Sequence, residues 1–209
     1  MTKKVIVFLA EGFEEVEAVT PIDYLRRAGI EVSSVAIGSS INVKSARNIQ
    51  ICADTTIDIL MKAGELKANN WDGVVIPGGL PGADNLAASK EVGDFVLEMA
   101  KAGKLVSAIC AAPARVLFPL GLLAGKNFTC FPGEETKVVN AAANSGANAK
   151  PIWKEDRVVV DGNIISSCSA GSAGEFSCAI VSWFLGEDEG KKLAERVLLL
   201  TNTACCTCK

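Results

Sequence analysis

The sequence contains no histidine among its 209 residues. This absence excludes a Ser-His-Asp triad, a Cys-His dyad and any zinc site that uses histidine. No segment offers about 18 consecutive apolar residues, the length that a transmembrane helix needs. An excess of positive charge is also lacking, because 21 Lys and Arg residues face 24 Asp and Glu residues and leave a net charge of −3. We therefore expect no contact with nucleic acid or with an anionic membrane surface.

The composition of the sequence indicates a globular domain. Hydrophobic residues make up 49% of the chain and charged residues 22%, which excludes intrinsic disorder and supplies a sizeable core. The apolar run at 5–10 is short and acidic residues follow it at once, so we interpret it as a buried strand and not as a signal peptide. We accordingly expect a cytoplasmic protein. Its eight cysteines are then expected to be reduced thiols: Cys52, Cys110, Cys130, Cys168, Cys178, Cys205, Cys206 and Cys208.

Short β-branched runs alternate with longer segments at helical spacing. Strands are predicted at 5–10, 30–37, 73–76, 105–109, 157–160 and 164–167, and helices at 14–28, 92–99, 176–183 and 193–200. Residues 38–58 show no helical period and are expected to form a small hairpin or an excursion around residues 47–52. The alternation predicts an α/β fold, a flavodoxin-like, doubly wound and mostly parallel sheet with helices on both faces. We assign residues 1–200 to this single domain and 201–209 to a cysteine-rich tail.

Three unusual segments leave predicted strands at the same edge of this sheet. They read EGFEEVE at 11–17, PGGLPG at 77–82 and AICAAP at 108–113. In an open α/β sheet, ligands bind beyond the carboxyl ends of the strands. A functional site is therefore expected where the three segments meet.

Cys110 stands where an apolar strand turns abruptly into a predicted helix, with small residues beside it. Small neighbours permit a sharp strand–turn–helix, the geometry of a nucleophile elbow, and the positive end of a helix dipole favours a thiolate. The alternative is a small, inert core residue, because free cysteine is among the most buried residue types. The elbow context favours Cys110 over the other seven cysteines.

The other two segments each allow two interpretations. In the segment PGG at 77–79, the backbone N–H groups of the two glycines would stabilise an oxyanion, or the glycines would only supply a tight turn with positive φ. Glu17 is one of four acids at the start of the first predicted helix, and compensation of the helix dipole explains Glu11, Glu14 and Glu15. Periodicity alone does not single out Glu17.

Taken together, the segments resemble the ThiJ/PfpI superfamily, in its parkinsonism-associated ("DJ-one") branch. The residues that carry the resemblance are EGFEEVE at 11–17, DYLRRAG at 23–29, PGG at 77–79, AICAAP at 108–113 and AGS at 170–172. It extends from about residue 5 to residue 200, so that only the tail is unmatched. The resemblance implies a cytoplasmic homodimer of flavodoxin-like fold that pairs through the first helix and needs no cofactor or metal.

The resemblance also implies roles for individual residues. It places the reactive thiol on Cys110, the partner carboxyl on Glu17 and the backbone amides that stabilise the thiolate on Gly79 and Ala111. A carboxyl beside a thiolate is pushed toward its protonated form, so the two groups are expected to titrate as a coupled pair.

Three further residues are expected to bind substrate: Arg47, Gly78 and Phe131. Arg47 matches an arginine that the family places near the site from the neighbouring subunit. Phe131 stands where human-like members carry histidine, and Cys168 replaces another, anion-binding arginine. Histidine-dependent protease activity is therefore not expected, whereas oxoaldehyde chemistry needs only the thiol and one acid–base group.

Two functions share this site. One is a glutathione-independent glyoxalase or deglycase that acts on methylglyoxal, a related small dicarbonyl or a glycated protein. The other is a redox sensor or oxidative-stress chaperone whose Cys110 is oxidised to a sulfinate. The tail contains three thiols in four residues: Cys205, Cys206 and Cys208. This pattern is typical of a site that binds a soft metal or undergoes thiol oxidation, but no nearby fourth ligand completes a tetrahedral site.

Overall fold

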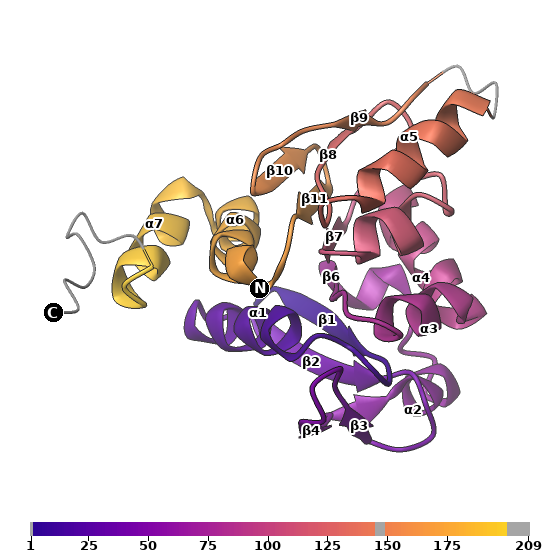
Figure 1. Cartoon of the computed structure of the whole chain (residues 1–209). Helices are drawn as coiled ribbons and strands as arrows, with labels where there is room; N and C mark the ends of the chain where they lie inside the picture. Colours follow the sequence, from indigo (N-terminus) through magenta and orange to yellow (C-terminus); the bar gives the residue numbers. More distant parts are fainter. Residues whose placement is uncertain (1, 145–148, 200–209) are drawn as a thin grey trace, which may run out of the picture.

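A seven-stranded sheet forms the centre of the computed structural model, which describes residues 2–144 and 149–199 (Figure 1). The strands of the sheet are β1 (Lys4–Leu9), β2 (Glu31–Ala36), β5 (Thr55–Thr56), β6 (Gly73–Ile76), β7 (Leu105–Ile109), β10 (Val158–Asp161) and β11 (Ile164–Ser167). They lie in the order β10-β11-β7-β6-β1-β2-β5. Every neighbouring pair is parallel except β10 and β11, which are antiparallel. The prediction of a mostly parallel, flavodoxin-like sheet is confirmed.

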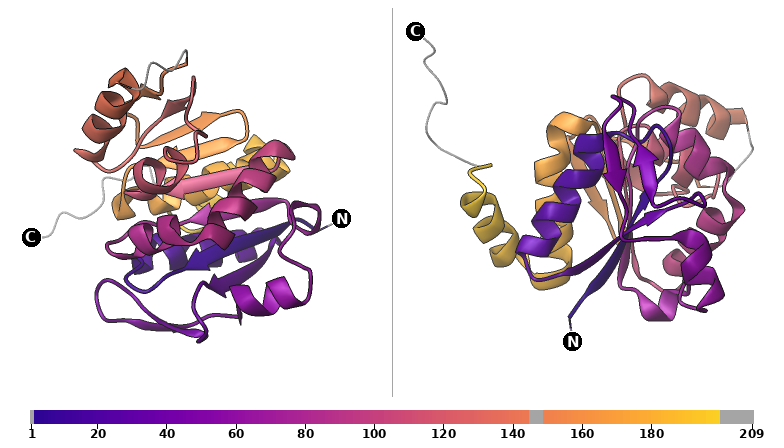
Figure 2. Two further views of the ribbon diagram at one scale, coloured as in Figure 1. Left: turned by 90° about the vertical axis from the view of Figure 1, so that its right-hand side faces the viewer. Right: turned by 90° about the horizontal axis from the view of Figure 1, so that it is seen from below.

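Helices cover both faces of the sheet, as Figure 2 shows from two directions. One face carries α1 (Glu15–Arg27), α6 (Ala173–Leu185) and α7 (Glu187–Arg196). The opposite face carries α2 (Ile57–Lys62), α3 (Gly82–Ala88), α4 (Lys90–Lys101) and α5 (Glu134–Asn144). Among these described helices, none is both long and apolar enough to cross a membrane.

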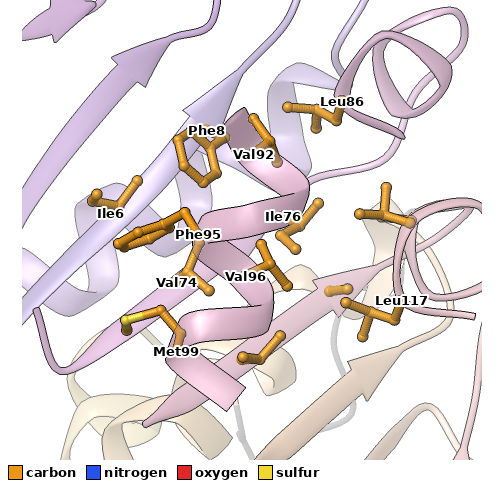
Figure 3. Packing of buried hydrophobic residues seen from close by; sticks show 14 of the residues in the cluster. Ile6, Phe8, Val74, Ile76, Leu86, Val92, Phe95, Val96, Met99 and Leu117 are labelled. Carbon is orange, nitrogen blue, oxygen red and sulfur yellow. The ribbon is translucent and has the colours of Figure 1, made fainter. Parts of the chain in front are cut away.

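The strands are apolar on both faces because each face has its own core. In β1, Ile6 and Phe8 belong to the cluster under α4, whereas Val5 and Val7 belong to the cluster under α1 and α6. This alternation follows from the two-residue period of a strand. Figure 3 shows the first cluster, in which one face of α4 packs against β1 and β6. The Phe8 and Phe95 rings meet edge to face at 5.9 Å, and both are buried.

Several smaller elements complete the fold. The expected hairpin within 38–58 is present as β3 (Asn42–Lys44) and β4 (Gln50–Cys52), which pair antiparallel. A second two-stranded sheet joins β8 (Asn127–Phe128) to β9 (Ile152–Trp153). The helix predicted at 193–200 is shifted, because α7 begins at Glu187 and ends at Arg196, and Leu198 has a positive φ of 56° that a helix cannot contain.

Candidate active site

Cys110 occupies a strained backbone position directly after β7. Its φ is +65°, a value that few residues other than glycine adopt. The backbone is fixed on both sides, because the Cys110 N–H donates to the Ser167 carbonyl at 2.9 Å and the Phe131 N–H donates to the Cys110 carbonyl at 2.8 Å. Strain of this kind persists only where the surrounding structure enforces it, and it gathers at functional sites. The sharp turn predicted from the small neighbours of Cys110 is therefore present.

The segment that follows Cys110 differs from the prediction. It is a single π-helical turn, Pro113–Leu117, and not a regular α-helix whose dipole would favour a thiolate. Burial and the neighbouring Glu17 carboxyl raise the pKa of the Cys110 thiol, and only the backbone amides of Ala111 and Gly79 oppose this effect. The backbone amides at this turn lower the pKa of the thiol, as expected, but burial and Glu17 outweigh them. A base is needed to remove its proton.

Glu17 lies in the first turn of α1 and points into the protein. Its side chain is only 1% exposed, whereas Glu11 is exposed and Glu14 is intermediate. The Glu14 carboxylate caps the helix by accepting the Glu17 N–H at 2.8 Å. Glu17 shares the buried face of α1 with Pro21 and Leu25, which lie four and eight residues further on. The structure thereby distinguishes Glu17 from the other acids, which periodicity alone does not.

The Glu17 carboxyl is only half satisfied. Its Oε2 accepts the Gly78 N–H at 2.9 Å, whereas its Oε1 has no partner with hydrogen-bond geometry in the described part of the chain. Burial raises the pKa of Glu17 to about 7, and the nearby Glu14 carboxylate adds to this effect. The neighbouring Cys110 thiol and the Gly78 and Ala170 amides lower that pKa in part. The carboxyl is therefore balanced between its two protonation states near neutral pH.

Gly78 and Gly79 allow these groups to meet. A Cβ atom placed on Gly78 would lie 2.8 Å from both the Cys110 Cβ and the Glu17 Oε2, so these two atoms are no more than twice that distance apart. Gly79 has a φ of +84°, and a Cβ there would lie 2.4 Å from the Glu14 nitrogen. The two interpretations of the glycine segment are therefore compatible. The turn requires glycine, and the Gly79 amide also faces the Cys110 sulfur.

A cavity of about 410 Å³ opens above the thiol. The predicted site residues in its wall are Cys110, Glu17, Gly79, Ala111, Arg47 and Phe131. Gly78 is the exception, because it is buried behind the carboxyl and takes no part in the wall. Gly78 holds Glu17 through its N–H, and its assignment to substrate binding stays a prediction.

Arg47 reaches this cavity from its own chain. It follows β3 on the hairpin loop, which the Ala46 N–H ties to the Phe13 carbonyl at 2.7 Å. A contribution from a neighbouring subunit, as the resemblance implied, is thus not required. The Arg47 guanidinium contacts the Ala46 carbonyl at 3.4 Å and forms no ion pair with a described residue. Its charge remains available to a ligand.

Other residues of the cavity wall were not predicted from the sequence. They are Glu14, Ala46, Leu80, Glu134, Ser169 and Ala170. Glu134 forms a two-point ion pair with Arg115 at 3.0 and 3.2 Å, which ties α5 to the turn after Cys110. Arg115 and Glu134 are far apart in sequence, so no local sequence pattern predicts this ion pair.

Within residues 2–144 and 149–199, no three His, Cys, Asp or Glu side chains gather where a metal ion could be held. The Cys130 thiol is buried, and burial raises its pKa to about 12. Cys168, at the place of the missing arginine, contacts the Ser172 hydroxyl at 3.3 Å. The cysteines of the tail, Cys205, Cys206 and Cys208, lie outside the described residues.

The fold and the site together define a class of protein: a flavodoxin-like α/β protein in which a strained cysteine and a buried carboxyl meet at the carboxyl edge of the sheet. The sequence profile of the DJ-1/PfpI family matches residues 3–183. The chain therefore belongs to the DJ-1/PfpI family, as the sequence motifs indicated.

Curated relatives support this assignment. Two Arabidopsis thaliana proteins, DJ-1 homolog B and DJ-1 homolog A, are 37% and 36% identical to this chain over 198 residues, or 95% of its length. The chain spans only 42% and 46% of those two proteins, less than half of each. A Caenorhabditis elegans relative named glutathione-independent glyoxalase DJR-1.2 is 30% identical over 195 residues, which cover 93% of this chain and 95% of the relative.

Solved structures share the fold. The crystal structure of Drosophila melanogaster DJ-1beta gives a TM-score of 0.83 at 34% identity and covers 96% of this chain and 100% of its own. The structure of oxidised DJ-1 from Toxoplasma gondii gives a TM-score of 0.80 at 32% identity and covers 94% and 98%.

Proposed function

We propose that the protein converts small α-oxoaldehydes, such as methylglyoxal and glyoxal, to 2-hydroxy acids without glutathione. The observation that carries this proposal is the pairing of the Cys110 thiol with the Glu17 carboxyl, whose Oε1 is unpartnered at a cavity wall. The reaction needs one sulfur nucleophile and one acid–base group with a pKa near the working pH. The glyoxalase name of the Caenorhabditis elegans relative supports the same chemistry.

The first step forms a hemithioacetal. The Cys110 sulfur attacks the aldehyde carbon, so a carbon–sulfur bond forms as the carbonyl π bond breaks, and the Glu17 carboxylate takes the thiol proton. Negative charge develops on the former aldehyde oxygen. The Gly79 and Ala111 N–H groups, which already lower the pKa of the thiol, are placed to stabilise that charge.

The second step moves hydrogen between neighbouring carbons. Glu17 first gives the thiol proton to the hemithioacetal oxygen and becomes a carboxylate again. It then removes the hydrogen of the former aldehyde carbon as a proton and returns that proton to the adjacent carbon, while the hydroxyl proton on the first carbon moves to the oxygen of the second. The first carbon is thereby oxidised to a thioester and the second reduced to an alcohol, so no external oxidant or reductant is required. Water then cleaves the carbon–sulfur bond, releasing the 2-hydroxy acid and restoring the thiol. Early glycation adducts on proteins would use the same residues.

The test is lactate formation from methylglyoxal by the reduced protein in the absence of glutathione. Cys110→Ser is expected to abolish it. Cys178→Ser is the matched control, because Cys178 is a part-buried free thiol on α6 outside the cavity wall. Loss of activity in both variants, or in neither, would contradict the assignment of Cys110.

A second candidate function is redox sensing through a Cys110 sulfinate. The solved structure of an oxidised relative favours it, and the same two amides and carboxyl would hold the charged group. The absence of lactate from the reduced protein, together with selective oxidation of Cys110 by mild peroxide, would support the sensor over the enzyme.

A further inference from the structure

The cavity above Cys110 has two chemically different zones. Its floor holds the reacting groups, Cys110 and Glu17. Two large apolar side chains, Leu80 and Phe131, also line it, although they are 51% and 46% exposed. Leu80 lies in the segment between β6 and α3, and Phe131 in the segment between β8 and α5. Two loops from different parts of the chain thus bring apolar groups to the same opening.

This apolar zone is fixed relative to the thiol. The Phe131 N–H donates to the Cys110 carbonyl at 2.8 Å, and Leu80 directly follows Gly79, whose amide faces the Cys110 sulfur. A ligand attached to the sulfur would therefore occupy a cavity that both side chains line. Exposed apolar surface beside a cleft is typical of ligand-binding sites, because burial by the ligand removes it from water.

The cavity wall holds three acids, Glu14, Glu17 and Glu134, and one cation, Arg47. Glu14 accepts the Glu17 N–H at 2.8 Å as the cap of α1. Glu134 is already neutralised by Arg115 at 3.0 Å and by Lys137 at 2.8 Å. Arg47 has no ion pair with a described residue. The wall thus offers a cation for substrate oxygens and an apolar zone for the remainder of the molecule.

The size of the cavity exceeds what a three-carbon dicarbonyl needs. Pockets of about 300–1,000 Å³ accommodate ligands much larger than methylglyoxal, and this one measures about 410 Å³. We infer that the preferred substrates are α-oxoaldehydes whose second substituent is an aryl or branched alkyl group, seated between Leu80 and Phe131. This inference rests on the proposed function and adds the substrate class.

The first test compares kcat/KM for phenylglyoxal and methylglyoxal from initial rates. We expect the wild-type protein to prefer phenylglyoxal by about tenfold, the effect that a well-filled apolar subsite has on specificity. Leu80→Ala and Phe131→Ala should each remove most of this preference, because each lowers kcat/KM for phenylglyoxal more than kcat/KM for methylglyoxal. Ile59→Ala is the matched control, because Ile59 is 55% exposed on α2 and lies outside the cavity wall.

A second readout does not depend on turnover. Mandelate and lactate, the products of the two substrates, should each protect Cys110 from iodoacetamide, mandelate at about one-tenth of the concentration. Phe131→Ala should abolish this difference. If neither substrate is turned over but mandelate protects selectively, the proposed reaction fails and the aryl subsite stands.

Equal protection by mandelate and lactate, or a substrate preference unchanged in both variants, would overturn the inference. An unchanged substrate preference would indicate that Leu80 and Phe131 instead contact a peptide or a second copy of the chain.

Discussion

At the scale of single residues, the site depends on one buried carboxyl. Glu17 is 1% exposed, and only one of its oxygens has a hydrogen-bond partner among the residues that the structure describes. Ionisation there lacks the hydration that an exposed glutamate receives, which is why the pKa rises to about 7. The Cys110 thiol beside it resists ionisation for the same reason, so that the pair holds one proton once the pH is above about 7.

The raised pKa predicts a stability cost that depends on pH. A carboxyl whose pKa is about 7 in the folded state and 4.5 in the unfolded state destabilises the fold as pH rises from 4.5 through 7. At about 1.4 kcal/mol per pKa unit, the loss is about 3 kcal/mol. Glu17→Gln does not titrate, so its free energy of unfolding relative to wild type should increase by this amount between pH 4.5 and pH 8. Denaturant unfolding at both pH values measures it, and a difference that does not change with pH would contradict the assignment.

Oxidation of Cys110 tests the same groups without a substrate. Graded peroxide should convert Cys110 to a sulfinate before the other thiols, since the Gly79 and Ala111 amides and a protonated Glu17 stabilise the anion. Glu17→Asp should still permit oxidation but leave the sulfinate less protected, because the shorter side chain weakens the hydrogen bond. Mass spectrometry identifies the modified residues. Sulfinate on Cys205, Cys206 or Cys208 while Cys110 remains a thiol would refute the assignment.

Some properties of the site residues could be predicted from the sequence, and others could not. The turn at Cys110 follows from small neighbours at a strand end, a local property that the sequence displays. The pKa of the thiol does not follow from the local sequence, because burial and Glu17, which is distant in sequence, determine it. Arg47 lines the cavity of its own chain, which the sequence did not predict, since the path of the β3–β4 hairpin depends on tertiary contacts. Its contribution to a neighbouring subunit stays a prediction.

At the scale of elements, the segments around the site are held together by ion pairs. Arg115, in the turn after Cys110, bonds to Glu134 on α5 through two nitrogens and to Asp84 on α3 at 2.6 Å. The Glu134 side chain is only 13% exposed, so water replaces a lost partner poorly. These bonds fix three elements relative to the nucleophile.

Arg115→Met should therefore lower the free energy of unfolding by about 1–3 kcal/mol, the usual cost of leaving a partly buried charged partner unsatisfied. The exposed pair of Lys90 and Asp94 on α4 is the control. Lys90→Met should cost no more than about 0.5 kcal/mol, since exposed helix pairs contribute little. Chemical denaturation of both variants makes the comparison, and equal losses would show that the Arg115 bonds contribute nothing beyond a surface pair.

The strands were easier to predict than the helices. β6, β7 and β11 match their predicted bounds, because apolar runs buried on both faces are continuous in sequence. In contrast, α2, α3 and α5 were not predicted. They are short or rich in small and polar residues, and packing against the sheet supplies most of their stability.

At the scale of the whole molecule, one surface of α1 is unusually apolar. Val16 and Val19 lie three residues apart and are 45% and 42% exposed. We expect this surface to pair two copies of the chain, as the family resemblance implied. Sedimentation should report a dimer at micromolar concentration, and Val19→Asp should shift it toward monomer while Ile59→Asp does not. A wild-type monomer under these conditions would contradict the expectation.

The central claim is that Cys110 and Glu17 act as a pair that holds one proton. Its most direct test is the pH dependence of kcat/KM for methylglyoxal between pH 5 and pH 9. The rate should fall about tenfold per pH unit below an apparent pKa near 7, where Glu17 is protonated and the thiol loses its base. Glu14→Gln, which removes a neighbouring negative charge, should move this limb to lower pH. A profile that is flat across this range, or a limb that Glu14→Gln leaves in place, would contradict the account.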